Sequence, residues 1–109
     1  MNDLIAFLTA RLDEKQQYAE DLLTYGLGDL SGAVSLSGQM LREVEADRKL
    51  LDLYERAKSY RDQVFARPEP RSISDEMRAV TQMMALEQVL RLRVAIYSDH
   101  PGYRQEWKP

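Results

Sequence analysis

The chain has 109 residues, a length typical of one domain, and 44% hydrophobic with 30% charged residues is a composition of folded, not disordered, proteins. The net charge of -3 is too small for a polyanion mimic and has the wrong sign for non-specific nucleic-acid binding, so nucleic acid is not expected as a partner. The absence of cysteine excludes disulfides, thiolate catalysis and cysteine-based zinc sites.

The start of the chain, residues 1–14, lacks the basic region and the long apolar stretch of a signal peptide. No apolar run reaches the roughly 20 residues that a membrane helix needs. We therefore expect a cytoplasmic protein with no membrane association.

The first predicted element is a helix over residues 3–25. Apolar residues recur in it at helical spacing, as in Ile5, Leu8 and Leu12. Gly26 offers the left-handed conformation that commonly ends a helix.

Residues 26–38 are predicted to form a loop, because they hold four of the five glycines together with three serines. The same segment contains Leu27, Leu30, Val34 and Leu36, so we expect it to lie on the core. A short strand over "GAVSLS" is the less favoured alternative, since no other segment offers it a clear partner.

The second predicted helix covers residues 37–65, which contain no glycine or proline after Gly38. Its apolar stripe includes Val44, Leu51 and Tyr54. At 1.5 Å a residue this helix would be about 42 Å long, more than the diameter of a compact domain of this size. Part of the apolar stripe of the second or the third helix would then face water, so we predict an oligomer, with a homodimer favoured. The alternative is that the loop over residues 26–38 covers this stripe within one chain.

Pro68 and Pro70 break the second helix from a third, predicted over residues 74–97 and capped by Ser72 or Ser74. Apolar residues lie on several faces of the third helix, so we expect it to be the most buried of the three. The fold class is therefore all-α: a three-helix hairpin or bundle in a single domain over residues 1–109, in which the last two helices run antiparallel. A tail over residues 98–109 is expected to pack on the helices.

Two residues could act as an acid or a base, and each has a structural alternative. Glu87 lies on a methionine-rich seam, where burial would raise its pKa, but it could instead pair with Arg48 or Arg91. His100 follows Asp99, and an Asp–His pair is half of a catalytic triad, but the chain has no nucleophile in a suitable context. The stretch "SDHPGY" is also typical of the end of a helix. We therefore predict no catalytic residue and no enzyme.

Glu43 and Asp47 share a helix face, as two ligands of a carboxylate metal site would. The chain has one His, outside the helices, so a solvated charged face is the favoured interpretation, and we expect no metal and no cofactor. Met77, Met83 and Met84 are interpreted as core filling in preference to a ligand pocket.

The tail ends in "YRQEWKP", where Tyr103 and Trp107 are four residues apart, so one helical turn would place both rings on one side. The rings either fold back on the helices, which we favour, or form a docking surface. The predicted partner- or ligand-binding residues are Arg93, Tyr97, His100, Tyr103, Arg104 and Trp107.

The tail "YSDHPGYRQEWKP" resembles the "YADHPDYREEWRP" ending of a family of short actinobacterial and phage proteins, the domain of unknown function numbered 6221. "DLIAFLTARLDE" resembles the opening helix of that family, and "LREVEADRKLLDLYE" resembles its central "LREVEAKRRLLD" helix. The resemblance implies an actinobacterial or phage origin and a helical fold, and it implies no reaction.

The chain departs from this family before "LREVEA", where many members carry a Trp and a His-x-x-x-His stretch. Here "GLGDLSGAVSLSGQ" stands instead, so no metal or ligand role of that stretch is transferred. The function expected from the sequence is a non-enzymatic helical interaction protein that binds a protein partner or itself. The alternative is a small-ligand or nucleotide-binding sponge, with a pocket of Arg93, Arg104 and Trp107 between subunits.

Overall fold

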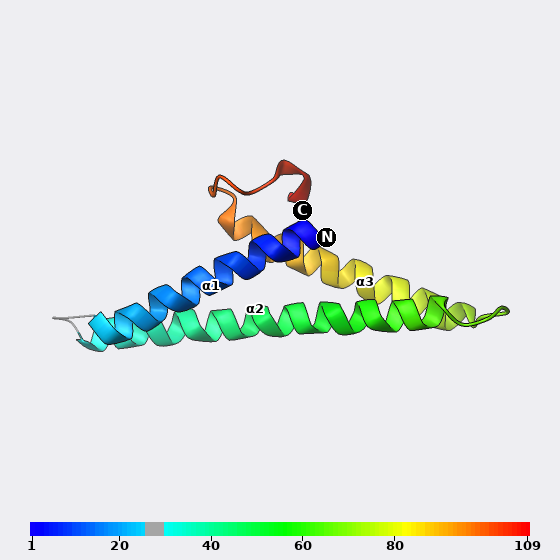
Figure 1. The fold of residues 1–109 in the computed structure, drawn as a ribbon, viewed down its shortest axis with the longest axis horizontal. Coiled ribbons are helices and arrows are strands. Elements are labelled where there is room, and N and C mark those ends of the chain that lie inside the picture. The colour runs from blue at the N-terminus through cyan, green and yellow to red at the C-terminus, as the bar shows by residue number, and fades with distance from the viewer. Residues whose placement is uncertain (26–29) are drawn as a thin grey trace. The chain divides into compact units, whose positions relative to one another are not determined.

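The structure is a computed structural model that describes residues 1–25 and 30–109, and the regular elements in these residues are all helices, without a strand (Figure 1). The elements are the helices α1 (Asn2–Tyr25), α2 (Leu30–Phe65) and α3 (Ile73–Val94), followed by the short 3₁₀ helices η1 (Ala95–Tyr97) and η2 (Gln105–Trp107). The predicted all-α fold is confirmed. No helix in the described part of the chain is both long enough and apolar enough to cross a bilayer.

The N-terminal end of α2 differs from the prediction. The helix begins at Leu30, so the predicted loop over residues 26–38 and its strand alternative are wrong for residues 30–38, and residues 26–29 lie outside the described chain. Each glycine inside a helix costs about 1 kcal/mol, which is why the composition pointed to a loop. A cross-helix contact favours the helix instead, because the buried Ser37 hydroxyl donates a hydrogen bond to the Ala19 carbonyl oxygen at 2.7 Å.

The contacts divide the described chain into two compact units, which are described separately. The N-terminal unit is Asn2–Lys49, and the C-terminal unit is Leu50–Pro109 together with Met1. The 36-residue helix α2 contributes to both, and at 1.5 Å a residue it is about 54 Å long. The single domain expected over residues 1–109 stays a prediction.

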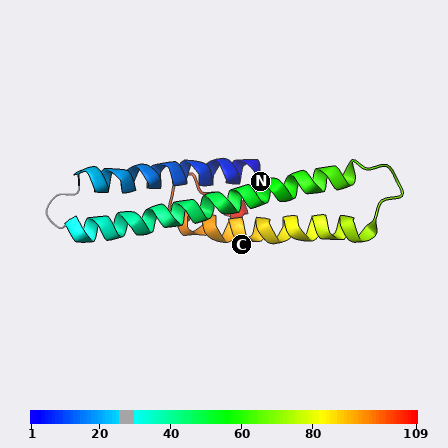
Figure 2. The same ribbon diagram turned by 90° about the horizontal axis from the view of Figure 1, so that it is seen from below.

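In the N-terminal unit, α1 and the first part of α2 lie side by side and run antiparallel (Figure 2). Two ion pairs fix this direction together with the hydrogen bond of Ser37. Lys15 contacts Glu43 with 2.5 Å between Nζ and Oε2, and Asp13, earlier in α1, meets Arg48, later in α2, at 2.9 Å.

In the C-terminal unit, the last part of α2 and the whole of α3 form an antiparallel hairpin (Figure 2). Buried side chains recur at helical spacing on both helices. They are Tyr54, Ala57 and Val64 on α2 and Ala79, Met83, Leu90 and Val94 on α3. The antiparallel arrangement predicted for the last two helices is therefore present.

Arg71 organises the connection between α2 and α3. Its guanidinium donates to the carboxylates of Glu76 at 2.7 Å and Glu69 at 3.1 Å, and it lies over the Phe65 ring, 5.7 Å from the centroid. The peptide bond between Glu69 and Pro70 is cis. The hydrogen bonds of Arg71 hold the chain in position where the second helix ends and the third begins.

The bounds of α3 are close to the predicted 74–97. The Ser72 hydroxyl caps the helix by accepting a hydrogen bond from the Asp75 amide at 3.3 Å, as one of the two predicted caps. The α-helix ends at Val94, and the last residues expected in it form η1 instead.

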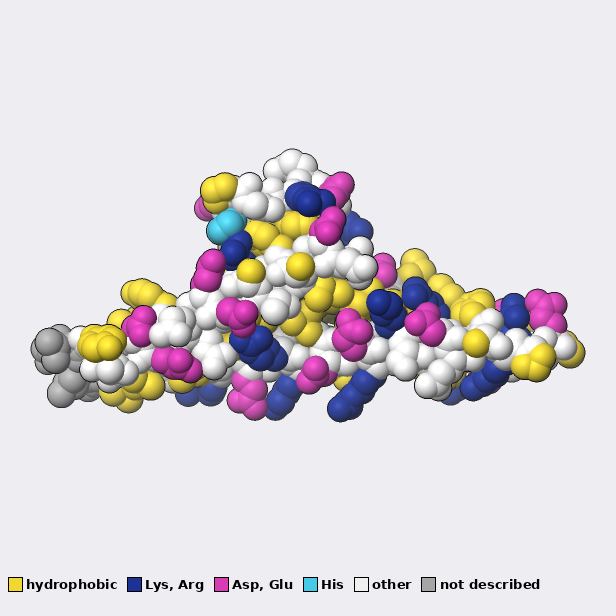
Figure 3. Space-filling model, in the orientation of Figure 1, with side chains coloured by type: hydrophobic (Ala, Val, Ile, Leu, Met, Phe, Trp, Pro, Cys, Tyr) yellow, Lys and Arg dark blue, Asp and Glu magenta, His cyan; other side chains and the backbone are white. Residues whose placement is uncertain are grey.

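Contrary to the prediction, α3 is not the most buried helix. Six large apolar side chains on it are exposed: Ile73, Met77, Val80, Met84, Val89 and Leu92. Met77 and Met84 are each 65% exposed, so core filling is wrong for them and right for the buried Met83. Within its unit, α3 packs against one helix, which covers only one of its faces. Figure 3 shows hydrophobic side chains gathered on the surface over α3.

Candidate functional site

A tight turn follows η1, and His100 lies at its centre. The His100 amide donates to the Tyr97 carbonyl at 2.9 Å, and the Tyr103 amide donates to the His100 carbonyl at 2.9 Å. The imidazole takes part as well, because the Gly102 amide donates to Nδ1 of His100 at 2.9 Å. The His100 ring is therefore part of the turn's own hydrogen bonding, with Nδ1 as the acceptor.

The residues after this turn form an aromatic cluster. The rings of Tyr103 and Trp107 meet edge to face, with centroids 5.8 Å apart and planes at 82°. The guanidinium of Arg104 lies over the Trp107 ring, 5.5 Å from its centroid. Trp107 is only 6% exposed. The two rings are on one side as predicted, but not through one helical turn, because Arg104 between them is extended and the helix begins only at Gln105.

The tail packs on α3, as expected for the fold. Arg91, on the last turns of α3, donates a hydrogen bond from Nη1 to the carbonyl oxygen of Glu106 at 3.0 Å. This contact was not predicted from the sequence, where Arg91 was considered only as a partner of Glu87. The sequence could hardly have indicated this bond, because the acceptor is a backbone oxygen, which every residue has. Whether that oxygen comes near Arg91 depends on the direction in which the turn around His100 sends the chain.

The structure brings together part of the predicted binding set. Tyr103, Arg104 and Trp107 form the aromatic cluster, and the turn of His100 joins it to Tyr97 through backbone bonds. The sixth residue, Arg93, is half-buried on the last turn of α3.

An open hollow of about 430 Å³ lies beside this cluster. Its described lining is Ala95, Ser98, Tyr103, Gln105, Lys108 and Pro109. Of the six predicted binding residues only Tyr103 lines it, whereas Ser98, Gln105 and Lys108 were missed by the sequence analysis. Arg93, Arg104 and Trp107, which were expected to build a ligand pocket, are not part of this lining.

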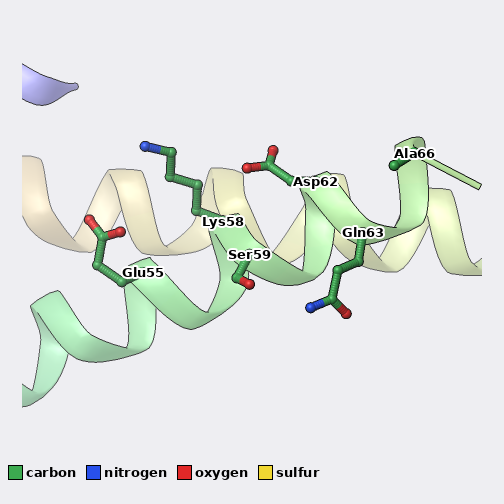
Figure 4. A pocket seen from close by; sticks show the side chains of 6 residues that line it. All are labelled: Glu55, Lys58, Ser59, Asp62, Gln63 and Ala66. Carbon is green, nitrogen blue, oxygen red and sulfur yellow. The ribbon is translucent and has the colours of Figure 1, made fainter.

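A second open hollow, of about 410 Å³, follows one face of α2 in the C-terminal unit. Its lining residues are Glu55, Lys58, Ser59, Asp62, Gln63 and Ala66, which succeed one another at alternating steps of three residues and one residue (Figure 4). Figure 4 shows the polar ends of these side chains pointing in different directions instead of converging on one point. This surface is a polar helix face, without the convergent polar groups of a ligand site.

Glu87 lies on α3, opposite Tyr54 of α2. Burial, and after it the negative charge of Glu87, raises the pKa of Tyr54 above its usual value. The arginines predicted to pair with Glu87 are engaged elsewhere: Arg48 contacts Asp13, and Arg91 contacts the tail. The phenol and the carboxylate are therefore neighbours in the hairpin.

The two carboxylates considered as metal ligands lie in different surroundings. Glu43 is bound to Lys15 and its side chain is 41% exposed, whereas Asp47 is buried, with 1% of its surface exposed, so the predicted solvated face is wrong for Asp47. In residues 1–25 and 30–109, no three His, Asp or Glu side chains gather closely enough to hold a metal ion.

Comparison with known proteins gives one match. No curated protein and no solved structure is significantly similar to the chain. The sequence matches a family described as "Family of unknown function (DUF6221)" over residues 1–109, which is the whole chain. This is the family that the opening helix, the central helix and the tail resemble, and the protein belongs to it.

Proposed function

We propose that this protein is a non-enzymatic helical interaction protein, and that its first partner is another copy of the same chain. The observation that carries the proposal is the surface of α3, where six large apolar side chains are exposed. Four of them, at positions 73, 77, 80 and 84, recur on one side of the helix, and a contiguous apolar surface on a folded domain usually marks a protein-binding surface. Isolated apolar residues would not support this conclusion, but a succession along one helix does.

The surroundings of the two candidate acid–base residues support a function without catalysis. Nδ1 of His100 accepts a backbone hydrogen bond in the turn of the tail. Glu87 lies opposite the buried Tyr54 in the hairpin, and it is not among the residues that line either of the two hollows described above. Family membership adds no reaction, and the actinobacterial or phage origin and the cytoplasmic location stay predictions.

The hollow beside the tail favours the alternative of a small-ligand-binding protein. It has a volume of about 430 Å³ and carries the ammonium group of Lys108 and the hydroxyl of Ser98 at its wall. An anionic ligand of modest size would suit these groups. The aromatic cluster lies next to the hollow and could extend it in an assembly of two chains.

Native mass spectrometry of freshly purified protein separates the two functions. Self-association predicts a species of twice the 12.6 kDa chain mass, without a further mass of a small molecule. A species of one chain that carries a stoichiometric small molecule would favour the ligand-binding alternative. One chain without any addition would contradict self-association.

A further inference from the structure

Four of the exposed apolar residues of α3 form a regular stripe, which we call the α3 seam: Ile73, Met77, Val80 and Met84. Ile73 is 74% exposed, and the two methionines are 65% exposed. The seam belongs to the C-terminal unit alone. It is separate from the buried face of α3, which contains Ala79, Met83 and Leu90.

The spacing of the seam is that of a coiled coil. Its steps are four, three and four residues, the alternation that keeps apolar side chains on one side of a helix that pairs with another helix. The matching surface is therefore a second helix with the same spacing. A second copy of α3 supplies it without any further assumption.

The charge distribution along α3 permits two copies to meet. Between Arg78 and Arg91 only Glu87 is charged, over twelve residues. Thr81 and Gln88, both exposed beside the seam, are polar and uncharged, and the charged residues Asp75, Glu76 and Arg78 lie in the half of the seam that begins at Ile73. Depletion of charge with enrichment of methionine is the composition of the centre of a protein interface.

The area is also of the order that a dimer needs. The four side chains of the seam are between 41% and 74% exposed, and Thr81, Ala85 and Gln88 extend this surface toward the roughly 800 Å² per partner of a standard interface. An isolated apolar residue such as Leu53 on α2, 48% exposed, has no such surroundings.

Glu87 favours one orientation of the two helices. It follows Met84 by three residues and is half-buried, between the seam and the face of α3 that meets Tyr54. In a parallel pair in register, the two Glu87 carboxylates would lie at the same level of the pair, which brings like charges together. In an antiparallel pair, Ile73 meets Met84 of the second copy and Met77 meets Val80, and each Glu87 lies beyond these apolar layers.

We infer that the α3 seam is a self-association surface on which a second copy of the chain packs with its own α3 antiparallel. This inference rests on the proposed function and deepens it, because it assigns the surface, the occupant and the orientation. A twofold axis would pass between Met77 and Val80, so both copies use the same residues.

Cross-linking through single cysteines tests the inference, because the chain has no cysteine of its own. We would prepare Ile73→Cys, Met84→Cys and, as the control on an exposed residue outside the seam, Leu53→Cys. Each variant is treated by itself with a short bismaleimide. An equimolar mixture of Ile73→Cys and Met84→Cys is treated in the same way. Circular dichroism confirms the helix content, and light scattering before treatment gives the mass of each sample.

The mixture of Ile73→Cys and Met84→Cys should give on the order of tenfold more cross-linked dimer than either variant alone or Leu53→Cys. The reason is that positions 73 and 84 are about 16 Å apart along one helix, so like positions are distant in an antiparallel pair. Cross-linking of Ile73→Cys to itself would overturn the antiparallel arrangement. A dimer by light scattering without cross-links would overturn the seam but leave self-association intact, and a monomer would overturn both.

Discussion

His100 shows how a chemically distinctive residue can be used for local structure. Its Nδ1 accepts the Gly102 amide at 2.9 Å, and its backbone groups bond Tyr97 and Tyr103. The ring therefore completes the turn that sends the tail back along α3. Tyr54 gives a different case, in which burial in the hairpin, and not a contact in a cleft, alters the proton equilibrium.

Replacement of His100 tests its role in the turn. Asn can accept the Gly102 amide through its side-chain oxygen, so His100→Asn should leave stability unchanged and self-association within about threefold of the wild type. His100→Ala removes the acceptor and should lower the free energy of unfolding by about 1 kcal/mol. Urea denaturation and sedimentation measure the two effects. Loss of association in a fully stable Asn variant would show that the imidazole contacts the partner.

Tyr54 should make stability fall at alkaline pH. Because its pKa is raised in the folded protein, its contribution is fully present below the pKa of an unfolded tyrosine, about 10, and is lost as the pH rises through the folded value. Over that window the slope is at most about 1.4 kcal/mol per pH unit. In urea denaturation between about pH 8 and pH 11.5, Tyr54→Phe should lose less stability than the wild type. Tyr18→Phe, which removes an exposed phenol, is the control, and parallel curves for wild type and Tyr54→Phe would refute the expectation.

At the scale of elements, the predictable features were those encoded locally. The break at Pro68 and Pro70, the cap at Ser72 and the contact of Tyr103 with Trp107 follow from residue type and spacing, and the structure contains all three. The start of α2 at Leu30 could not be predicted in this way. It depends on packing against α1. The glycine-rich composition indicates only the free-energy cost of a helix in this segment, and not the contact between Ser37 and Ala19 that offsets this cost.

In the candidate site, too, the features that depend on local sequence were predictable and those that depend on the path of the chain were not. The aromatic pair was predictable from spacing, whereas the bond of Arg91 to the Glu106 carbonyl and the lining of the hollow by Ser98 and Lys108 depend on where the turn directs the chain. The exposure of Met77 and Met84 was missed for a related reason. Apolar residues on several faces predict burial, but not whether the covering surface is in the same chain.

Ser37 tests the corrected start of α2. Ser37→Ala removes the buried hydrogen bond to the Ala19 carbonyl and should lower the free energy of unfolding by about 1 kcal/mol. Ser35→Ala, on an exposed position of the same helix, should change it by less than about 0.5 kcal/mol. Equal effects of the two substitutions would contradict the packing of this segment on α1.

Truncation tests the packing of the tail. Deletion of residues 103–109 removes the buried Trp107 ring and the acceptor of Arg91, so it should lower the free energy of unfolding by about 3 kcal/mol. Deletion of the exposed Lys108 and Pro109 alone is the control and should have little effect. If thermal denaturation shows the same melting temperature for both truncations and the wild type, the tail is a docking segment and not part of the folded core.

At the scale of the whole molecule, the apolar pattern of α3 and the exposure of its side chains agree if a second chain covers the helix. The sequence pattern is that of a buried helix, but one neighbouring helix covers only one of its faces. Self-association through the α3 seam would bury Ile73, Met77, Val80 and Met84 as well. The structural role of α3 and the proposed function are then consequences of the same residues.

The most direct test is multi-angle light scattering on the wild type, Met84→Glu and Leu53→Glu at micromolar concentration. In the proposed antiparallel pair Met84 meets Ile73 of the second copy, so a carboxylate at position 84 has to be buried against apolar side chains without a partner, which strongly disfavours association. The wild type and Leu53→Glu should elute at twice the 12.6 kDa chain mass, and Met84→Glu should elute near 12.6 kDa with unchanged helix content. A wild-type mass of 12.6 kDa, or a Met84→Glu variant that remains a dimer, would contradict the account.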